Sequence, residues 1–446
     1  MDFEGFKDKK IAIVWYGREG KSSCDFLIKI GISPQNITIL DGAEKIPWTP
    51  DFGCESIFGE HYLDTLDRYD IIIKTPGISI YHPKIASVKD KITSQAQIFF
   101  DHYQGKVIAV SGTKGKSTTV SLIYEMLQHA GRDTQLIGNI GNPVLDYLDT
   151  KNPQSQTNQY AVFELSSYML EWLTKKNYIS VLLNIYADHL DRHQGFENYQ
   201  DAKLNILKGS QYNLVRDEIM ERHNFTSQEV KEEAIRIFGH EGRYRYQDGW
   251  FFVDGTKVLD DDKLLLRGEH NRMNICAVLG ICDIMQIDYE VLAETLATFK
   301  GLPHRMEIIW TYGEIIRVDD AISTTPESTI QAIKTFDHQI DTIFLWGTDR
   351  GYVFDDLIKT IKTYGIRNIV LFPDSGKRIL EAIKSQDIQN FNILQTDDMK
   401  AAVLFAYQHT HPSKICLLST ASPSYSLRKN FEEKGDLFKR YIKEIG

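Results

Sequence analysis

The sequence predicts an α/β protein with three domains in series, each built around an open, largely parallel sheet. A chain of 446 residues is too long for one ordinary domain. Its 42% hydrophobic and 25% charged residues are typical of a globular protein. Short β-branched apolar runs alternate with helical patterns, which indicates parallel strands joined by right-handed crossovers. We place the domains at residues 1–104, 105–301 and 302–446.

The first domain is predicted to be a Rossmann-like open sheet. The apolar run 11–16 is expected to be a buried strand, and the turn 17–23 opens a helical pattern. A second strand ends at Asp41, and a β-branched run over 71–77 ends in proline and glycine. The loops after these strands would lie at the edge where open sheets bind ligands.

The central domain is predicted from residue 107 onward, where strand, glycine turn and helix follow without a gap. Further strands are expected over 160–165 and 181–186. The stretch 243–266 has short alternating runs split by two Asp-Gly pairs, which predicts antiparallel hairpins within this domain.

The C-terminal domain is predicted to be a second Rossmann-like unit. Helical patterns such as PESTIQAIKTF and MKAAVLFAYQH separate its strands. We expect strands over 314–320, 341–347, 368–373, 391–395 and 414–419.

Composition excludes several classes of protein. A formal net charge of −10 argues against nucleic acid as a partner. The start of the chain has acidic residues and no apolar run, and the longest apolar stretches are far shorter than the roughly 20 residues that span a bilayer. We therefore expect no membrane partner and a cytoplasmic location. Five scattered cysteines without a CxxC pair indicate neither a disulfide framework nor a zinc site.

The strongest local signal is SGTKGKSTT at 111–119, between a predicted strand and a helix. A glycine-rich turn in that context directs backbone N–H groups and a helix dipole at phosphates. Lys116 supplies a charge for the β- and γ-phosphates, and the Ser117 or Thr118 hydroxyl can reach Mg²⁺. The motif therefore predicts a P-loop-type site for ATP and Mg²⁺. No G-x-G-x-x-G follows the first strand, which disfavours an oxidoreductase.

This short loop, GTKGKST, resembles the nucleotide loop of the Mur ligases and of their folylpolyglutamate-synthetase relatives. Eight further blocks occur in the family's order, so the resemblance spans nearly the whole chain. They are TPG, GNIGNP, ELSSYML, NIYADHLDRH, YQDAKLNIL, GEHNRMN, GLPHRME and KNFEEKGDLF. Within the family, the set is most similar to the members that add glutamate to UDP-N-acetylmuramoyl-L-alanine.

The resemblance implies roles for individual residues. The residues expected to act in catalysis are Lys116, Glu164, His189, Lys203, His304 and Arg305. Those expected to bind ATP are Gly112, Thr113, Lys114, Gly115, Lys116, Ser117, Thr118, Asn271, Arg305 and Asp320. The UDP-linked precursor would be bound by Gly17, Arg18, Glu19, Asp41, Thr75, Pro76, Gly77 and Asn139. Glutamate would be bound by Thr324, Arg350, Ser424, Tyr425 and Phe431.

A metal site is also implied, with Ser117, Glu164, His189 and Lys203 around Mg²⁺. In the family this lysine is carbamylated by CO₂, and its anionic form supports the metal. The reaction with CO₂ requires a neutral amine, hence a desolvated lysine or one beside other cations. From the residues alone, Lys203 would instead lie on a solvated helix face, Glu164 would be a helix N-terminal acid, and His189 a loop histidine.

The amino-acid site departs from the family pattern. Ile322, in VDDAISTTPEST, stands where the D-glutamate enzymes usually carry a lysine, and SPSYS replaces a SPACAS-type run. Loss of that cation leaves an L-glutamate-adding variant open beside the D-glutamate enzyme, which we favour. Arg350 would pair with a glutamate carboxylate.

The implied reaction is an acyl-phosphate mechanism: ATP phosphorylates the alanyl carboxylate, and the glutamate amine then displaces phosphate. Arg305 follows the predicted domain boundary, so closure of the third domain would complete the site. A folylpolyglutamate-type ligase and a non-catalytic nucleotide-binding module are the alternatives. The separate domain before residue 105 disfavours the first. The second is disfavoured by the joint presence of Glu164, Lys203, His189 and Arg305. We expect a monomer.

Overall fold

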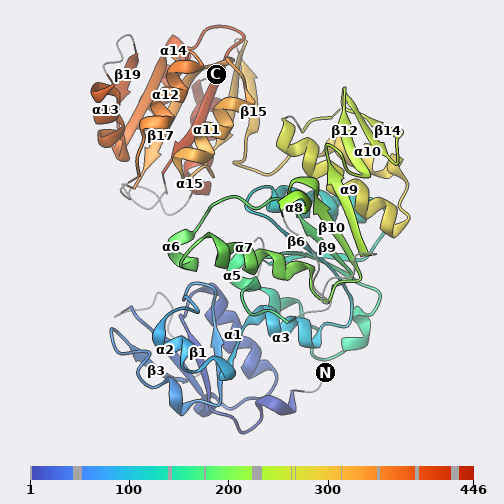
Figure 1. Ribbon diagram of the computed structural model, residues 1–446. Helices are drawn as coiled ribbons and strands as arrows, with labels where there is room; N and C mark the ends of the chain where they lie inside the picture. The colour runs from blue at the N-terminus through green and yellow to red at the C-terminus, as the bar shows by residue number, and fades with distance from the viewer. Residues whose placement is uncertain are drawn as a thin grey trace. The chain divides into compact units, whose positions relative to one another are not determined.

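The computed structural model describes residues 3–43, 53–138, 143–174, 177–222, 234–262, 264–266, 268–312, 314–348, 352–386, 391–422 and 431–445. The chain divides into two compact units, Met1–Phe299 and Lys300–Gly446. Two sheets lie in the first unit and one in the second (Figure 1). The α/β fold class is confirmed. The predicted boundary at 301 lies beside the border between the units, whereas the one at 104 falls inside the first unit and stays a prediction.

The first sheet has five parallel strands in the order β3-β2-β1-β4-β5. The central strand β1 is fully buried, as its uninterrupted apolar sequence predicts for a strand covered on both faces. Connections leave β1 in both directions, so its carboxyl end is a switch point of the kind that binds ligands. The elements are β1 (Ile11–Val14), α1 (Arg18–Lys29), β2 (Ile37–Asp41), β3 (Glu55–Phe58), β4 (Ile71–Lys74), α2 (Pro83–Ala86), β5 (Ile92–Thr93) and α3 (Gln95–His102).

The second sheet has nine strands in the order β14-β13-β12-β11-β10-β9-β6-β8-β7. Its parallel part runs from β7 to β12, and β6 lies between strands that follow it in sequence, which makes a second switch point. The strands are β6 (Lys106–Ser111), β7 (Thr134–Gly138), β8 (Tyr160–Glu164), β9 (Ile179–Leu182), β10 (Tyr212–Arg216), β11 (Ile235–Gly239), β12 (Tyr244–Gln247), β13 (Trp250–Val253) and β14 (Thr256–Asp260). The helices are α4 (Lys116–His129), α5 (Ser167–Leu170), α6 (Leu190–His193), α7 (Phe196–Leu204), α8 (Asp217–Arg222), α9 (Glu269–Met285) and α10 (Tyr289–Thr298).

The predicted hairpins form the far edge of this sheet. β12, β13 and β14 pair antiparallel, joined at the two Asp-Gly pairs. Asp248 and Gly249 have φ of 49° and 81°, and Asp254 and Gly255 have 48° and 82°. Two successive residues with positive φ are what a tight I′ hairpin turn requires, and Asp-Gly is suited to it. The hairpin prediction is confirmed.

The third sheet has the order β15-β16-β20-β17-β18-β19. Five strands are parallel, as predicted, and β15 adds an antiparallel edge strand that the alternation did not predict. The strands are β15 (Glu307–Tyr312), β16 (Ile315–Asp320), β17 (Ile340–Gly347), β18 (Asn368–Asp374), β19 (Asn392–Gln395) and β20 (Ile415–Ala421). The helices are α11 (Pro326–Thr335), α12 (Asp355–Thr363), α13 (Ser375–Ser385), α14 (Met399–His409) and α15 (Phe431–Ile445).

Alternate residues of β17 show how this sheet is covered on both faces. Ile343 and Leu345 belong to an apolar cluster with α11, α12 and α13. Phe344 and Trp346 belong to another with α14 and α15. A strand with apolar residues on both faces needs helices on both sides, which explains the layers seen around β17 in Figure 1.

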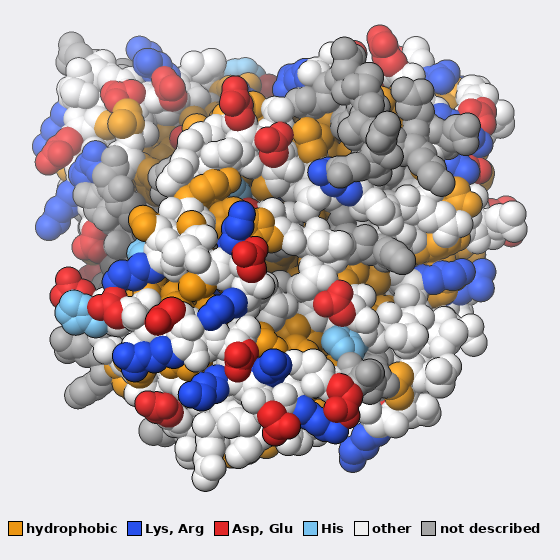
Figure 2. All heavy atoms as spheres, turned by 60° about the horizontal axis from the view of Figure 1, so that its bottom comes forward, with side chains coloured by type: hydrophobic (Ala, Val, Ile, Leu, Met, Phe, Trp, Pro, Cys, Tyr) orange, Lys and Arg blue, Asp and Glu red, His pale blue; other side chains and the backbone are white. Residues whose placement is uncertain are grey.

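Charged side chains of both signs are interspersed on the surface (Figure 2). On the face shown in Figure 2, Lys and Arg side chains alternate with Asp and Glu and form no continuous basic patch. Among the residues that the structure describes, no helix has the length and apolar character needed to cross a membrane.

Candidate active site

The predicted phosphate loop connects β6 to α4. β6 ends at Ser111 and α4 begins at Lys116, so the loop backbone faces the N-terminus of a fourteen-residue helix. Gly115 has a φ of 87°, and a Cβ there would lie 2.6 Å from Oδ1 of Asn274. Glycine is therefore required at this position for conformation and for space. The loop has the geometry of an anion site.

Two residues that sequence reasoning missed hold the loop in shape. Asn184 Oδ1 accepts from the Lys114 N–H at 2.9 Å, and its Nδ2 donates to the Lys114 carbonyl at 3.1 Å. The hydroxyls of Tyr199 and Thr113 lie 2.8 Å apart. Both residues stand in blocks already singled out, NIYADHLDRH and YQDAKLNIL, which was the available signal. The expected strand 181–186 ends early, at Leu182, because the next residues bind the phosphate loop instead.

Lys116 and Lys203 converge on the Gly112 carbonyl. Lys116 Nζ donates to it at 2.9 Å, and Lys203 Nζ donates to it at 2.8 Å. Lys203 is 2% exposed and lies over the Tyr199 ring. The solvated-face interpretation of this lysine is therefore wrong. Burial, together with the positive charge of Lys116, lowers the pKa of Lys203 well below its ordinary value.

Acidic and imidazole groups surround the same lysine. Glu164, at the end of β8, is fully buried, and its negative charge and that of Asp188 act on Lys203. His189 precedes α6 with a φ of 54°. Burial lowers the pKa of His189 even though Asp188 opposes the shift. The structure thus brings the predicted residues Glu164, His189 and Lys203 to the phosphate loop, and it adds Asp188, which the sequence did not single out.

This donor set suits a divalent cation once the lysine charge is removed. Carboxylate oxygen is the ligand that Mg²⁺ prefers, and Glu164 supplies it, while the Ser117 hydroxyl stands at the first turn of α4. An ammonium group at Lys203 would oppose a metal at this place. A carbamate would replace that positive charge with oxygen ligands, so the fit depends on the state of Lys203.

The predicted precursor residues lie at the carboxyl ends of β1, β2 and β4. Gly17 caps α1, and Arg18 and Glu19 form its first turn. Burial raises the pKa of Glu19, against the positive charges of Arg18 and Lys74. Asp41 is buried, and its oxygens accept from two backbone N–H groups, of Tyr16 at 2.7 Å and of Ala43 at 2.9 Å.

The Thr75–Gly77 loop of the first sheet lies beside α6 of the central region. Arg192 donates to the carbonyls of Gly77 at 2.7 Å and Pro76 at 2.5 Å. A Cβ at Gly77 would lie 1.5 Å from the Trp15 ring. The predicted precursor loop and the predicted metal residue His189 are therefore on neighbouring segments. Asn139, also predicted for the precursor, lies outside the described residues.

Asn271 lies close to the nucleotide loop. It occupies the first turn of α9, and its Oδ1 accepts from Nδ2 of Asn274 at 3.3 Å. Asn274 is the residue that lies against Gly115. Asn271 is thus one helical turn from the residue that packs on the phosphate loop, which suits its expected place in the ATP site.

The predicted ATP residues of the second unit are clustered around β16. Asp320 is buried at its end, where Oδ2 accepts from the Ser419 hydroxyl at 2.8 Å. Burial raises the pKa of Asp320 to about 6, and the nearby positive charge of Arg305 opposes that shift. Arg305 and Asp320 therefore lie close to each other in this unit.

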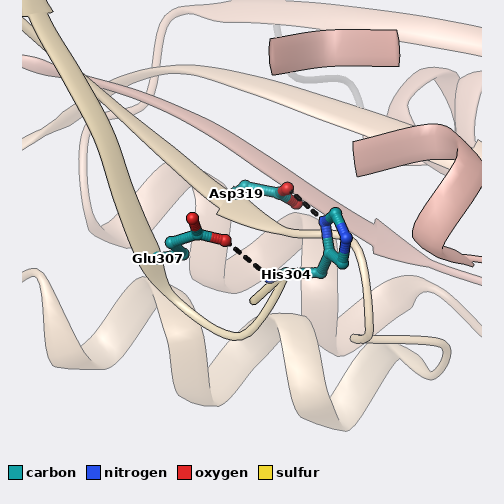
Figure 3. Close-up of side chains that lie close together, drawn as sticks. All are labelled: His304, Glu307 and Asp319. Carbon is teal, nitrogen blue, oxygen red and sulfur yellow. Dashed lines mark hydrogen bonds and ion pairs between the residues drawn. The ribbon is translucent and has the colours of Figure 1, made fainter. Parts of the chain in front are cut away.

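His304 belongs to a group of side chains drawn in Figure 3 with Glu307 and Asp319. Its Nδ1 lies 2.6 Å from Asp319 Oδ2, and its backbone N–H donates to Glu307 at 2.8 Å. Because a carboxylate only accepts, the Nδ1 nitrogen carries the proton. Lys439 donates to Glu307 at 2.6 Å and lies 3.7 Å from Asp319. A lysine already neutralises these acids, so we interpret the group as an ion-pair network that orients His304.

The structure describes only some of the residues that were predicted to bind the substrate glutamate. Thr324 is half-buried in the loop between β16 and α11. Ile322 N donates to the His304 carbonyl at 3.2 Å, so the substituted position lies beside the histidine loop. Phe431 begins α15. The other three predicted residues, Arg350, Ser424 and Tyr425, lie outside the described residues.

A strand, a glycine loop and a helix, with two lysines and a buried carboxylate beside them, define a protein that binds a nucleoside triphosphate. Residues 110–282 match the model of the Mur ligase middle domain. The chain is 32% identical to the UDP-N-acetylmuramoylalanine–D-glutamate ligase of Clostridioides difficile, covering 100% of both chains. It is 29% identical to the enzyme of the same name from Staphylococcus aureus, covering 98% of this chain and 97% of that one.

The solved structure of UDP-N-acetylmuramate–alanine ligase from Thermotoga maritima has the same fold. It matches with a TM-score of 0.60 at 20% identity, over 98% of this chain and 100% of that one. The chain belongs to the Mur ligase family, whose members are ATP-dependent, amide-bond-forming ligases.

Proposed function

We propose that this chain joins D-glutamate to UDP-N-acetylmuramoyl-L-alanine in the synthesis of peptidoglycan precursors. The observation that supports this most is the full-length similarity to ligases of that name, combined with a phosphate loop that gathers Lys116, Lys203, Glu164 and His189. ATP would transfer its γ-phosphoryl group to the alanyl carboxylate, releasing ADP. The glutamate amine would then attack the acyl carbon, lose a proton and displace inorganic phosphate.

The chain's own residues would act mainly by holding and neutralising charge. The loop N–H groups and Lys116 would bind the ATP phosphates, where negative charge accumulates during transfer. Ser117, Glu164, His189 and carbamylated Lys203 would hold Mg²⁺, which would neutralise negative charge on the reacting groups. For the ATP site, Asn271, Arg305 and Asp320 stay predictions.

Carbamylation of Lys203 is supported by its burial and its neighbours. Burial and the positive charge of Lys116 lower the pKa of Lys203 and so favour the neutral amine, which is the form that reacts with CO₂. With ¹³C-bicarbonate, the wild-type chain should show a carbamate ¹³C signal that Lys203→Met lacks. Lys208→Met, which changes an exposed lysine of the same region, is the control. A signal unchanged in Lys203→Met would contradict the assignment.

The glutamate isomer is tested by turnover. Phosphate release would be measured with Mg²⁺-ATP and UDP-N-acetylmuramoyl-L-alanine, with D- and L-glutamate in parallel. We expect release with D-glutamate, which would make Ile322 a tolerated change. Release with L-glutamate only would favour the L-glutamate-adding variant, and no release with either would refute the substrate assignment.

Two further features follow from the proposal. A reaction that consumes ATP and a nucleotide-linked precursor would take place in the cytoplasm. The first sheet provides a separate set of ligand loops before residue 105, which a folylpolyglutamate-type ligase would not need. We expect a monomer, which light scattering of the purified chain would test.

A further inference from the structure

A pocket lies between the loops of the first sheet and those of the second, inside the first unit. The first-sheet side includes the predicted precursor residues Arg18, Glu19 and Pro76. The opposite side comes from the end of β7 and from α5 and the turn after it. Charged and aromatic side chains of both sides meet in its wall, among them Arg18, Lys74, Tyr168, Glu171 and Trp172.

Glu171 stands out among them. Its side chain is only 2% exposed, and neither of its carboxylate oxygens receives a hydrogen bond from any residue that the structure describes. Nδ1 of the buried His193 lies 3.3 Å from Oε1, within ion-pair distance, but it makes no hydrogen bond to the carboxylate. A buried carboxylate that accepts no hydrogen bond is costly, so its presence in a pocket wall points to a hydrogen-bond donor that arrives with a ligand.

Neighbouring cations do not supply that donor. Lys74 Nζ donates to the carbonyls of Thr75 at 3.2 Å and Ile78 at 2.8 Å. Arg192 donates to the carbonyls of Pro76 and Gly77 in the same loop. The positive charges of both side chains oppose the rise in the pKa of Glu171 that burial causes, but neither donates a hydrogen bond to its carboxylate. The oxygens of Glu171 therefore keep their capacity to accept hydrogen bonds.

The rest of the wall indicates the chemistry of the ligand. Arg18, in the first turn of the twelve-residue α1, suits a phosphate group. Tyr168 and Trp172 present aromatic surface, and Trp172 is 39% exposed. An aromatic surface beside a buried acceptor suits a group with apolar faces and hydroxyl or amide donors on its rim, which describes an amino sugar.

We propose that Glu171 is a specificity residue that accepts a hydrogen bond from a hydroxyl or from the acetamido N–H of the precursor's amino sugar. This inference rests on the proposed function, because the UDP-linked sugar is the ligand that would link the phosphate end of the pocket to the reacting carboxylate. Glu171 thereby distinguishes a nucleotide that carries the sugar from one that does not.

The test measures binding of three ligands to the full-length chain by calorimetry: UDP, UDP-N-acetylmuramate and UDP-N-acetylmuramoyl-L-alanine. Loss of a hydrogen bond to a buried carboxyl group should weaken both sugar-bearing ligands about tenfold in Glu171→Ala. UDP should bind within about twofold of wild type by the same reasoning. Glu171→Gln keeps the shape and one acceptor oxygen and should give an intermediate loss. Glu197→Gln, an exposed glutamate of α7, is the control.

Three results would refute the sugar contact. Equal weakening of all three ligands would show that Glu171 only maintains the pocket, and no weakening would show that the sugar does not reach it. If only the alanine-bearing ligand bound more weakly, Glu171 would contact the alanyl amide and not the sugar. If wild type binds neither sugar-bearing ligand, the proposed function fails as well. If Glu171→Ala does not fold, the same binding measurements on Glu171→Gln still test the sugar contact.

Discussion

Lys434, on α15, offers a quantitative test of how a buried lysine affects the free energy of unfolding of this protein. The side chain is 0% exposed, and Nζ lies 3.5 Å from the Trp346 carbonyl and 4.7 Å from the Trp346 ring. Burial lowers the pKa of Lys434 from 10.5 to about 7. The unfolded chain therefore keeps the lysine protonated between pH 7 and 10.5, where the folded chain does not. The contribution of Lys434 to the free energy of unfolding is therefore lowest below pH 7. It rises as the pH increases from 7 to 10.5.

The magnitude follows from the same shift. Lowering a pKa from 10.5 to about 7 corresponds to about 5 kcal/mol against the folded state below pH 7. Replacing Lys434 with methionine, which fills similar space without charge, should thus raise the free energy of unfolding by about 5 kcal/mol at pH 6.

The assay is chemical unfolding of the full-length chain at pH 6, 7.5 and 9. The gain in Lys434→Met should decline by about 3 kcal/mol between pH 6 and 9, since each pH unit within the window changes it by about 1.4 kcal/mol. Lys443→Met, on an exposed lysine of the same helix, should show no pH-dependent gain. A gain independent of pH, or a loss at pH 6, would refute the reasoning.

Two further substitutions test the loops of the first unit. Asn184→Ala removes both hydrogen bonds to Lys114 and should raise the KM for ATP roughly thirtyfold, because two bonds at about 1 kcal/mol each amount to about 2 kcal/mol. An unchanged KM in steady-state assays would contradict the role of Asn184. Gly77→Ala places a Cβ 1.5 Å from the Trp15 ring and should destabilise the fold by about 1–3 kcal/mol. Thermal unfolding measures this, and an unchanged midpoint would mean that Trp15 moves aside without cost.

Local signals in the sequence predict much of the site. The spacing of SGTKGKSTT between a strand and a helix predicts the phosphate loop, because Gly115 and the start of α4 are consequences of neighbouring residues. The Asp-Gly pairs predict their hairpins for the same reason. Glu164 could be named from its block, and its position at the end of β8 follows from strand alternation.

What local pattern could not reveal depends on burial and on long-range contacts. Lys203 has the sequence context of a solvated helix face, yet packing against Tyr199 and the Gly112 carbonyl removes its water. Asn184 gains its role only because β9 ends beside the phosphate loop. Sequence periodicity reports which face of an element is apolar, and it does not report which distant loop that element meets.

Residue order within short segments was enough to establish the fold class, the family resemblance and the phosphate loop. The identity of the charged groups that are buried together depends instead on the folded chain, because burial arises from contacts between segments far apart in sequence. Lys203 beside Lys116, and Glu171 in the wall of a pocket, are both of this kind. Their chemistry comes from desolvation, which a linear sequence does not display.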